Sequence, residues 1–257
     1  MDNIILKLNN KFNNIKFYDE GHLYIKDDTR EKYVSVTTLI HKYVKPFDKK
    51  YWLPIKAMEY GMTEGEVEED WIKINKISTV KGSVVHNYIE NYLANKIFKY
   101  PLQEILNEFN YDPIEKSFKI SITQFMDFYN TSKNKLIPVK SELIVYDDDY
   151  KVAGMVDQLY YNVKYKSLQL YDWKTNKDFN YYSKYKEKML EPLTHLDNCH
   201  YHIYSLQLSI YKHILEKNIE GLKLSDSYIV WFNGNENEKF KIIKCLDLSK
   251  EVKEILQ

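Results

Sequence analysis

Apolar side chains recur every three or four residues along several parts of the chain, the spacing that places them on one face of a helix. The segments with this spacing are 80–97, 117–132 and 200–218, the last ended by Gly221. Residues 48–80 show it in their first part, at Trp52, Ile55 and Met58, until the glycines around 61–65 interrupt it. We therefore predict helices over these segments.

Shorter apolar runs, rich in β-branched and aromatic residues, predict strands in the middle of the chain. Three of them follow one another with polar turns between: Leu136–Tyr146, Tyr150–Tyr161 and Ser167–Trp173. Tight turns between consecutive strands favour an antiparallel meander. A further pair is expected to form a hairpin across Asn233-Gly234-Asn235, and its strands are Tyr228–Phe232 and Phe240–Cys245.

The two ends of the chain predict shorter elements. Strands are expected over 15–17 and 23–25, on either side of a turn at Asp19-Glu20-Gly21, and over 33–36. The last of these runs into a capped helix start at Thr37-Thr38. A short helix over 248–256 is expected to close the chain.

The order helix, three strands, helix, strand describes an α/β unit with a mixed sheet. We expect residues 80–257 to form this core, a central mixed β-sheet flanked by helices. Residues 1–79 are expected to form an N-terminal elaboration of strands and helices packed on the core, so that the chain is one compact unit.

The composition fits a folded protein, because 44% of the 257 residues are hydrophobic. Lys and Arg number 37, and so do Asp and Glu. A neutral total neither requires nor excludes a nucleic-acid partner, since binding depends on a local basic patch. Tyrosine is abundant, at 24 residues, which either reflects an AT-rich genome or supplies rings that stack on unpaired bases.

Cysteine usage and hydropathy exclude several classes of protein. The two cysteines, Cys199 and Cys245, are too few for a four-cysteine zinc or iron–sulfur site. The first residues lack a basic segment followed by an apolar one, so we expect no signal peptide. No run approaches the ~18 apolar residues of a membrane span. We therefore expect a cytoplasmic protein without a membrane partner.

Two acidic residues and a lysine stand at the polar ends of apolar strands. Asp157 follows Gly154-Met155-Val156, and Asp172 is followed by Trp173 and Lys174. A carboxylate on a buried strand is unfavourable unless it has a partner or a metal. Phosphodiester cleavage needs oxygen ligands for a divalent metal, and a cation to hold the attacking water or the developing charge.

Strand geometry predicts how these groups are arranged. Side chains alternate along a strand, so Asp172 and Lys174 share one face while Trp173 anchors the other in the core. The backbone carbonyl of Trp173 stays free to bind a metal. A hairpin can bring Asp157 beside Asp172, and Glu142 on the preceding strand could add a further oxygen. An isolated Asp-x-Lys is more often a surface salt bridge, so the prediction depends on this context.

Two predicted helices add candidate groups. His86 could bind a transition metal such as Mn²⁺, oriented by Glu90 one turn later, although a lone helix histidine is more often structural. Gln207 and Tyr211, also four residues apart, could hold phosphate oxygens or the catalytic strand. The alternative for that pair is the polar edge of an ordinary amphipathic helix.

Together these residues resemble the RecB-like branch of the PD-(D/E)XK nucleases. That branch shows a Gly-x-x-x-His helix, a Glu strand, a Gly-x-x-Asp strand, an Asp/Glu-x-Lys strand and a Gln-x-x-x-Tyr helix, in that order. The corresponding residues here are Gly82–His86, Glu142, Gly154–Asp157, Asp172–Lys174 and Gln207–Tyr211. The segment Ser35–Ile40 also resembles a Ser-Val-Thr-Thr-Ile segment of the mitochondrial genome maintenance exonuclease group and its phage relatives.

The resemblance implies a restriction-endonuclease-like core and a role for each motif residue. The implied metal ligands are His86, Asp157, Asp172 and the carbonyl of Trp173, with Glu142 binding directly or through water. Lys174 would position or deprotonate the attacking water. The implied substrate-binding residues are Gln207 and Tyr211, which would also support the site, and Thr175, Lys81 and Ser83 in or beside the motifs.

The resemblance also implies an activity, that of a Mg²⁺- or Mn²⁺-dependent DNA exonuclease preferring single strands or ends. Such an enzyme would serve replication, recombination or repair beside partner proteins of those processes. Some relatives carry an iron–sulfur cluster on four cysteines, which the two cysteines here exclude. A viral or phage origin would place the protein in the cytoplasm of a host.

Three alternatives remain open from the sequence. The same chemistry could serve a structure-specific or flap-trimming endonuclease. The chain could be a catalytically inert nucleic-acid-binding scaffold, although such proteins usually lack one of the ligands and none is replaced here. A zinc site could use His195, Cys199, His200 and His202, although the spacing of His200 and His202 directs their rings to different helix faces.

Overall fold

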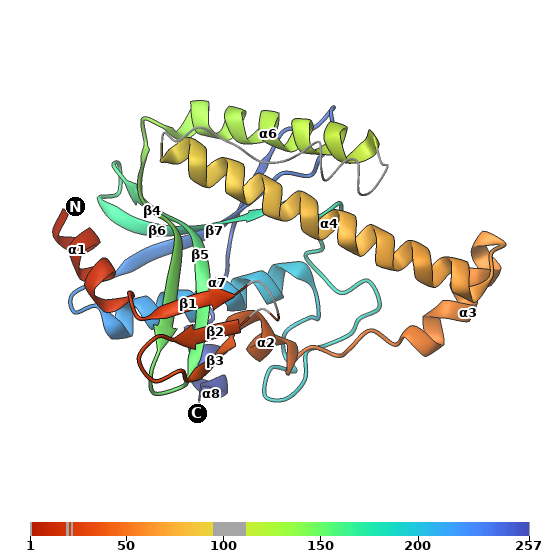
Figure 1. Cartoon of the computed structure of the whole chain (residues 1–257), viewed down its shortest axis with the longest axis horizontal. Helices are drawn as coiled ribbons and strands as arrows, with labels where there is room; N and C mark the ends of the chain where they lie inside the picture. The colour runs from red at the N-terminus through yellow and green to blue at the C-terminus, as the bar shows by residue number, and fades with distance from the viewer. Residues whose placement is uncertain (1, 19–20, 22, 95–111, 257) are drawn as a thin grey trace.

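The fold is α/β, an open mixed sheet with helices on both of its faces (Figure 1). The computed structural model describes residues 2–18, 21, 23–94 and 112–256. Over these ranges the sheet has eight strands in the order β1-β2-β3-β5-β6-β7-β8, with β4 paired to β5.

The strands are β1 (Ile15–Tyr18), β2 (Leu23–Lys26), β3 (Lys32–Ser35), β4 (Leu136–Asp147), β5 (Val152–Asn162), β6 (Ser167–Lys174), β7 (Leu224–Trp231) and β8 (Lys241–Lys244). The helices are α1 (Asp2–Lys11), α2 (Val36–His41), α3 (Lys49–Tyr60), α4 (Glu64–Leu93), α6 (Asp112–Ser132), α7 (His200–Asn218) and α8 (Ser249–Ile255).

Strand β5 is the centre of the sheet. It pairs with β4 along its whole length and with β6 along its second half, both antiparallel, and with β3 in parallel at its first two residues. Strand β7 joins β6 in parallel, and β8 joins β7 antiparallel. The predicted meander of three strands and the predicted C-terminal hairpin are therefore confirmed.

Each face of the sheet has its own apolar core. Helices α4 and α6 cover one face, where Tyr171, Trp173 and Phe232 are buried. Helix α7, with α1, α2 and α8, covers the other face, where Leu168 and Leu170 are buried. Side chains of β6 thus alternate between the two cores, as strand geometry requires.

Helices α3 and α4 are separated by capping residues. Gly61 ends α3 with a left-handed φ of 65°, and Thr63 begins α4 with a capping box to Glu66. Helix α4 then runs without interruption to Leu93, and its first half extends with α3 beyond the sheet (Figure 1). The boundary at 79/80 falls inside α4, and β3 adds a strand to the sheet, so the N-terminal region is built into the core.

The sequence did not predict α1. Its apolar residues Ile4, Ile5 and Leu8, together with Phe12, pack on the α7 face of the sheet. This stripe has helical spacing, but it covers fewer than three turns and is stabilised by tertiary packing rather than by local propensity. Residues 95–97 of a predicted helix, and Asp19 and Glu20 of a predicted turn, lie outside the described residues.

A search of the described helices for one that could cross a membrane, by length and apolar character, finds none.

Candidate metal centre

Three motif residues meet where β4, β5 and β6 lie side by side. The register pairs Ser141 with Gln158 and Leu143 with Val156, so Glu142 of β4 faces Asp157 of β5. On the other edge of β5, Gln158 pairs with Tyr171. Continuing that register by one residue brings Asp157 beside Asp172, as the predicted hairpin required.

The backbone of Glu142 is unusual for a residue in a strand. Its φ is 46°, in the left-handed region that residues other than glycine rarely adopt. Its neighbours Ser141 and Leu143 keep their regular partners, so the distortion is confined to this one residue. Local strain of about 1–3 kcal/mol, held in place by regular surroundings, is typical of functional sites.

Helix α4 places His86 over the two carboxylates. Its Nδ1 lies 3.5 Å from Oδ1 of Asp157 and 3.8 Å from Oε1 of Glu142. One ligand atom from each of the three residues falls within 4.8 Å of the other two. No other group of three histidine, cysteine or acidic residues converges in this way in the part of the chain that the structure describes.

The second nitrogen of His86 fixes the orientation of the ring. Its Nε2 lies 3.0 Å from the carbonyl oxygen of Trp173. A carbonyl only accepts, so Nε2 donates this hydrogen bond, and Nδ1 is the ring nitrogen that faces the carboxylates. Metal-binding histidines commonly donate their other N–H in this way. The Trp173 carbonyl takes the orienting role expected of Glu90, and its own role as a metal ligand stays a prediction.

Asp157 is held by the neighbouring strand. Its Oδ2 accepts a 2.7 Å hydrogen bond from the backbone N–H of Trp173. The other oxygen, Oδ1, is the one that faces His86. Backbone pairing therefore orients the carboxylate toward the centre of the site.

The buried Asp172 and the half-buried Lys174 form an ion pair on the α7 side of β6. The Lys174 Nζ lies 2.6 Å from Oδ2 of Asp172 and 4.5 Å from the centre of the Tyr204 ring. This oxygen of Asp172 makes no well-oriented hydrogen bond with any described residue. Asp172 lies outside the group formed by His86, Glu142 and Asp157, so its role as a metal ligand stays a prediction.

Burial and mutual repulsion disfavour the charged forms of the acidic side chains in the site. Burial, followed by repulsion from Asp157, raises the pKa of Glu142 to about 9. Burial raises the pKa of Asp172 to about 6, against the opposing effect of Lys174. Burial disfavours the charged form of Lys174, but the carboxylates of Asp172 and Asp157 outweigh it and raise the pKa. A bound cation would relieve this imbalance.

The donor atoms suit a divalent cation. Carboxylate oxygens of Glu142 and Asp157 are ligands that Mg²⁺ and Mn²⁺ prefer, and the Nδ1 atom of His86 adds a nitrogen suited to a transition metal. One ligand atom of each group lies within 4.8 Å of the other two. The residues present therefore fit the metal expected from the sequence.

Gln207 and Tyr211 lie on α7 beneath β5. Gln207 Nε2 donates a 3.1 Å hydrogen bond to the Tyr211 hydroxyl, and both residues are buried. A Cβ atom on Gly154 would meet the Tyr211 ring at 2.5 Å. Their placement favours the supporting role expected of them, since the Tyr211 ring packs directly against the strand that carries Asp157.

The remaining candidates lie around the end of β6. Lys81 is buried, and its Nζ donates to the carbonyl of Thr175 at 3.3 Å. The Thr175 hydroxyl lies 3.7 Å from the position of a Cβ on Gly82. Ser83 is exposed on α4. Lys81 and Thr175 are thus brought together next to Lys174, whereas Ser83 faces solvent.

Two tyrosines at the site were missed from the sequence. Tyr24 comes from β2, and burial together with the nearby carboxylates of Glu142 and Asp157 raises its pKa. Tyr204 comes from α7 and contacts Lys174. Neither stands in a motif, and in a chain with 24 tyrosines no local pattern separates them from the others.

The four residues of the alternative zinc site do not converge. Cys199 Sγ lies 3.2 Å from Nδ1 of His202. His195 instead contacts Glu251, and His200 accepts a hydrogen bond from the backbone of Asn180. Of these residues, none belongs to a metal-binding group in the described part of the chain.

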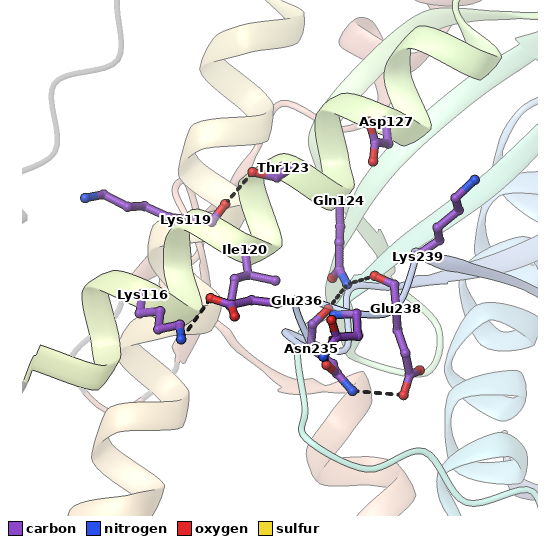
Figure 2. A pocket seen from close by; sticks show the side chains of 11 residues that line it. Lys116, Lys119, Ile120, Thr123, Gln124, Asp127, Asn235, Glu236, Glu238 and Lys239 are labelled. Atoms are coloured by element: carbon purple, nitrogen blue, oxygen red, sulfur yellow. Dashed lines mark hydrogen bonds and ion pairs between the residues drawn. The ribbon is translucent and has the colours of Figure 1, made fainter.

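Two cavities lie between α6 and the loop that joins β7 to β8. One of about 780 Å³ is shown in Figure 2, where Lys116 pairs with Glu236 across its wall. Gln124 holds the loop in place by donating to the carbonyls of Asn235 and Glu238. A cavity of about 660 Å³ adjoins it and reaches Ser117, Lys177 and Gly234.

The sequence matches no protein-family model, and no curated protein matches it.

Proposed function

We propose that this chain is a metal-dependent nuclease that hydrolyses phosphodiester bonds in DNA, built on a restriction-endonuclease-like core. The observation that supports the proposal most strongly is the convergence of His86, Glu142 and Asp157 within 4.8 Å. Beside them lies a half-buried lysine on an Asp-x-Lys strand. Oxygen-rich metal ligands next to a fixed cation are what cleavage of a phosphodiester requires.

Each group has a distinct role in this proposal. A divalent cation held by His86, Glu142 and Asp157 would supply Lewis-acid polarisation of a phosphoryl oxygen. Lys174 offers an ammonium group that can hold the attacking water and stabilise charge developing on the phosphate. Asp172 and Tyr204 fix the position of that ammonium.

The experiment is cleavage of end-labelled single-stranded DNA with Mg²⁺, Mn²⁺ or EDTA by the wild type and by Lys174→Ala. Cleavage should require metal, and the variant should lose about 10²–10³-fold in rate, the usual effect of removing one transition-state donor. DNA affinity should change little, because the contact acts in the transition state. Lys223→Ala is the matched control, since its side chain is 83% exposed and it precedes Leu224, which pairs with the end of β6 opposite to Lys174.

The outcomes separate the alternatives. Full activity of Lys174→Ala would refute the assignment of the site. DNA binding without cleavage in either metal would favour an inert scaffold. We propose that the enzyme acts as an exonuclease, and cutting of a closed circular single strand would show an endonuclease instead.

A further inference from the structure

A second cationic group lies on α4, five residues before His86. Lys81 is only 9% exposed, and its amine donates to the carbonyl of Thr175, the residue that follows Lys174. Burial is the one cause that shifts its pKa, which it lowers to about 8, with no contribution from a carboxylate. The amine is thus a buried positive charge without a counter-ion among the described residues.

Two hydroxyl groups approach the same point as this amine. A Cβ atom on Gly234 would lie 2.9 Å from Nζ of Lys81, 3.4 Å from Oγ of Ser117 and 4.0 Å from Oγ of Ser121. Ser121 is fully buried, and its hydroxyl has no hydrogen-bond partner in the described part of the chain. One amine and two hydroxyls from α4 and α6 therefore converge on the loop after β7.

The geometry of the loop is fixed, and a cavity adjoins the site at Ser117 and Gly234. Gln124 accepts from the backbone N–H of Gly234 at 3.3 Å and donates to Asn233 at 2.8 Å, which holds the loop against α6. The cavity of about 660 Å³ includes both Ser117 and Gly234 in its lining, with the exposed Lys177 on its wall.

A buried ammonium group without a counter-ion is unfavourable, and an unpartnered buried hydroxyl adds to the penalty. An anion with several oxygen atoms would satisfy both, since it accepts from lysine and from hydroxyl donors together. These are the donors that proteins direct at nucleic-acid phosphates. Lys81 precedes His86 by about 7.5 Å along the axis of α4, the rise of five helical residues.

We propose that Lys81, Ser117 and Ser121 form a phosphate-binding subsite beside the metal centre. The subsite holds a phosphate group of the nucleic-acid strand other than the one being cleaved, either an internal phosphodiester or a terminal phosphate. That the ligand is a nucleic acid rests on the proposed nuclease function, whereas the affinity for phosphate does not.

The test uses metal-free protein in EDTA, so that cleavage plays no part. Inorganic phosphate, titrated at constant ionic strength, should raise the melting temperature of the wild type, because it binds only the folded state. The affinity should fall about 10- to 100-fold in Lys81→Met, as expected for losing a charged hydrogen bond. Lys81→Met should itself be at least as stable as the wild type, since it removes an uncompensated buried charge.

Lys116→Met is the matched control, because it removes the same charge from a lysine that lines the adjoining cavity but is exposed and paired with Glu236. Its affinity for phosphate should change less than about threefold, since an exposed pair contributes little. Ser117→Ala, a milder change, should give an intermediate loss. Equal losses in Lys81→Met and Lys116→Met would overturn the proposal, because they would show a response to net charge alone.

A second arm identifies the source of the phosphate, using short single strands with a 5′-phosphate or a 5′-hydroxyl and binding measured in EDTA. If Lys81→Met loses the same affinity for both strands, the subsite binds an internal phosphodiester. If the loss is confined to the phosphorylated strand, the subsite binds the terminal phosphate. Unchanged affinity for both would overturn the subsite. If phosphate binding depends on Lys81 but DNA is not cleaved, the subsite stands and the nuclease proposal fails.

Discussion

Gly154 lies in β5 where the Tyr211 ring approaches closer than a Cβ atom permits. The added methyl of Gly154→Ala would meet the ring at 2.5 Å, and the ring cannot easily move, because it is buried and hydrogen-bonded to Gln207. Overpacking of this kind costs about 1–3 kcal/mol of unfolding free energy. We expect urea unfolding of Gly154→Ala to show this loss of unfolding free energy. Metal binding should also weaken, because β5 carries Asp157.

Gly65→Ala provides the control at the same scale. Gly65 is in the first turn of α4, where the nearest atom to a new Cβ is the Thr63 hydroxyl at 4.0 Å. Alanine should be neutral there or stabilise by up to about 1 kcal/mol. Addition of Tyr211→Leu to Gly154→Ala should recover part of the loss. A Gly154→Ala variant as stable as the wild type would show that the contact does not constrain the strand.

The site residues illustrate what single positions in the sequence predict. Asp172, Trp173 and Lys174 were placed correctly, because alternation along a strand depends only on local geometry. The contact from His86 to the Trp173 carbonyl was not predicted, because it depends on how α4 crosses the sheet. The left-handed backbone of Glu142 was not predicted either, since nothing in its neighbours requires it.

At the scale of elements, the turn between β4 and β5 is fixed by one buried carboxylate. Asp147 accepts from the backbone N–H groups of Asp149 and Tyr150 and from the side chains of Lys217 and Asn218 on α7. Burial opposes its ionisation, but these donors outweigh burial and lower its pKa. Asp147→Asn should therefore reduce the unfolding free energy by about 1–3 kcal/mol at pH 7.

The lowered pKa sets the pH dependence of this loss. The pKa of Asp147 in the folded protein lies below its value of about 3.9 in the unfolded chain. Its stabilising effect is therefore complete above about pH 3.9 and declines as the pH falls through the folded-state pKa. The difference between wild type and Asp147→Asn should shrink accordingly in urea unfolding below pH 4. Asp149→Asn, whose side chain is 77% exposed, should change stability by less than about 1 kcal/mol. A difference that persists undiminished in acid would contradict this account.

For the whole molecule, the sequence predicted the order of most elements but not their assembly. The meander β4–β6 and the hairpin of β7 and β8 follow from short connections between apolar runs. The parallel contact of β3 with β5 could not be predicted, because more than a hundred residues separate the two strands and no local pattern encodes their register. The same holds for α1, whose stability comes from packing against the sheet.

The metal centre links the site to the stability of the whole molecule. Glu142, Asp157 and Asp172 repel one another in the metal-free protein, so a divalent cation should bind the folded state far better than the unfolded chain, where these residues are far apart. At a hundred times its dissociation constant the ion should add about 2.7 kcal/mol, a rise of roughly 5–10 °C in Tm. Asp157→Asn should lose this rise, whereas Asp149→Asn should keep it. Equal Tm values of the wild type with Mn²⁺ and with EDTA would show that the ion does not bind at this site. A full rise without any DNA cleavage would separate the metal site from the proposed nuclease activity, because the cation would then be structural.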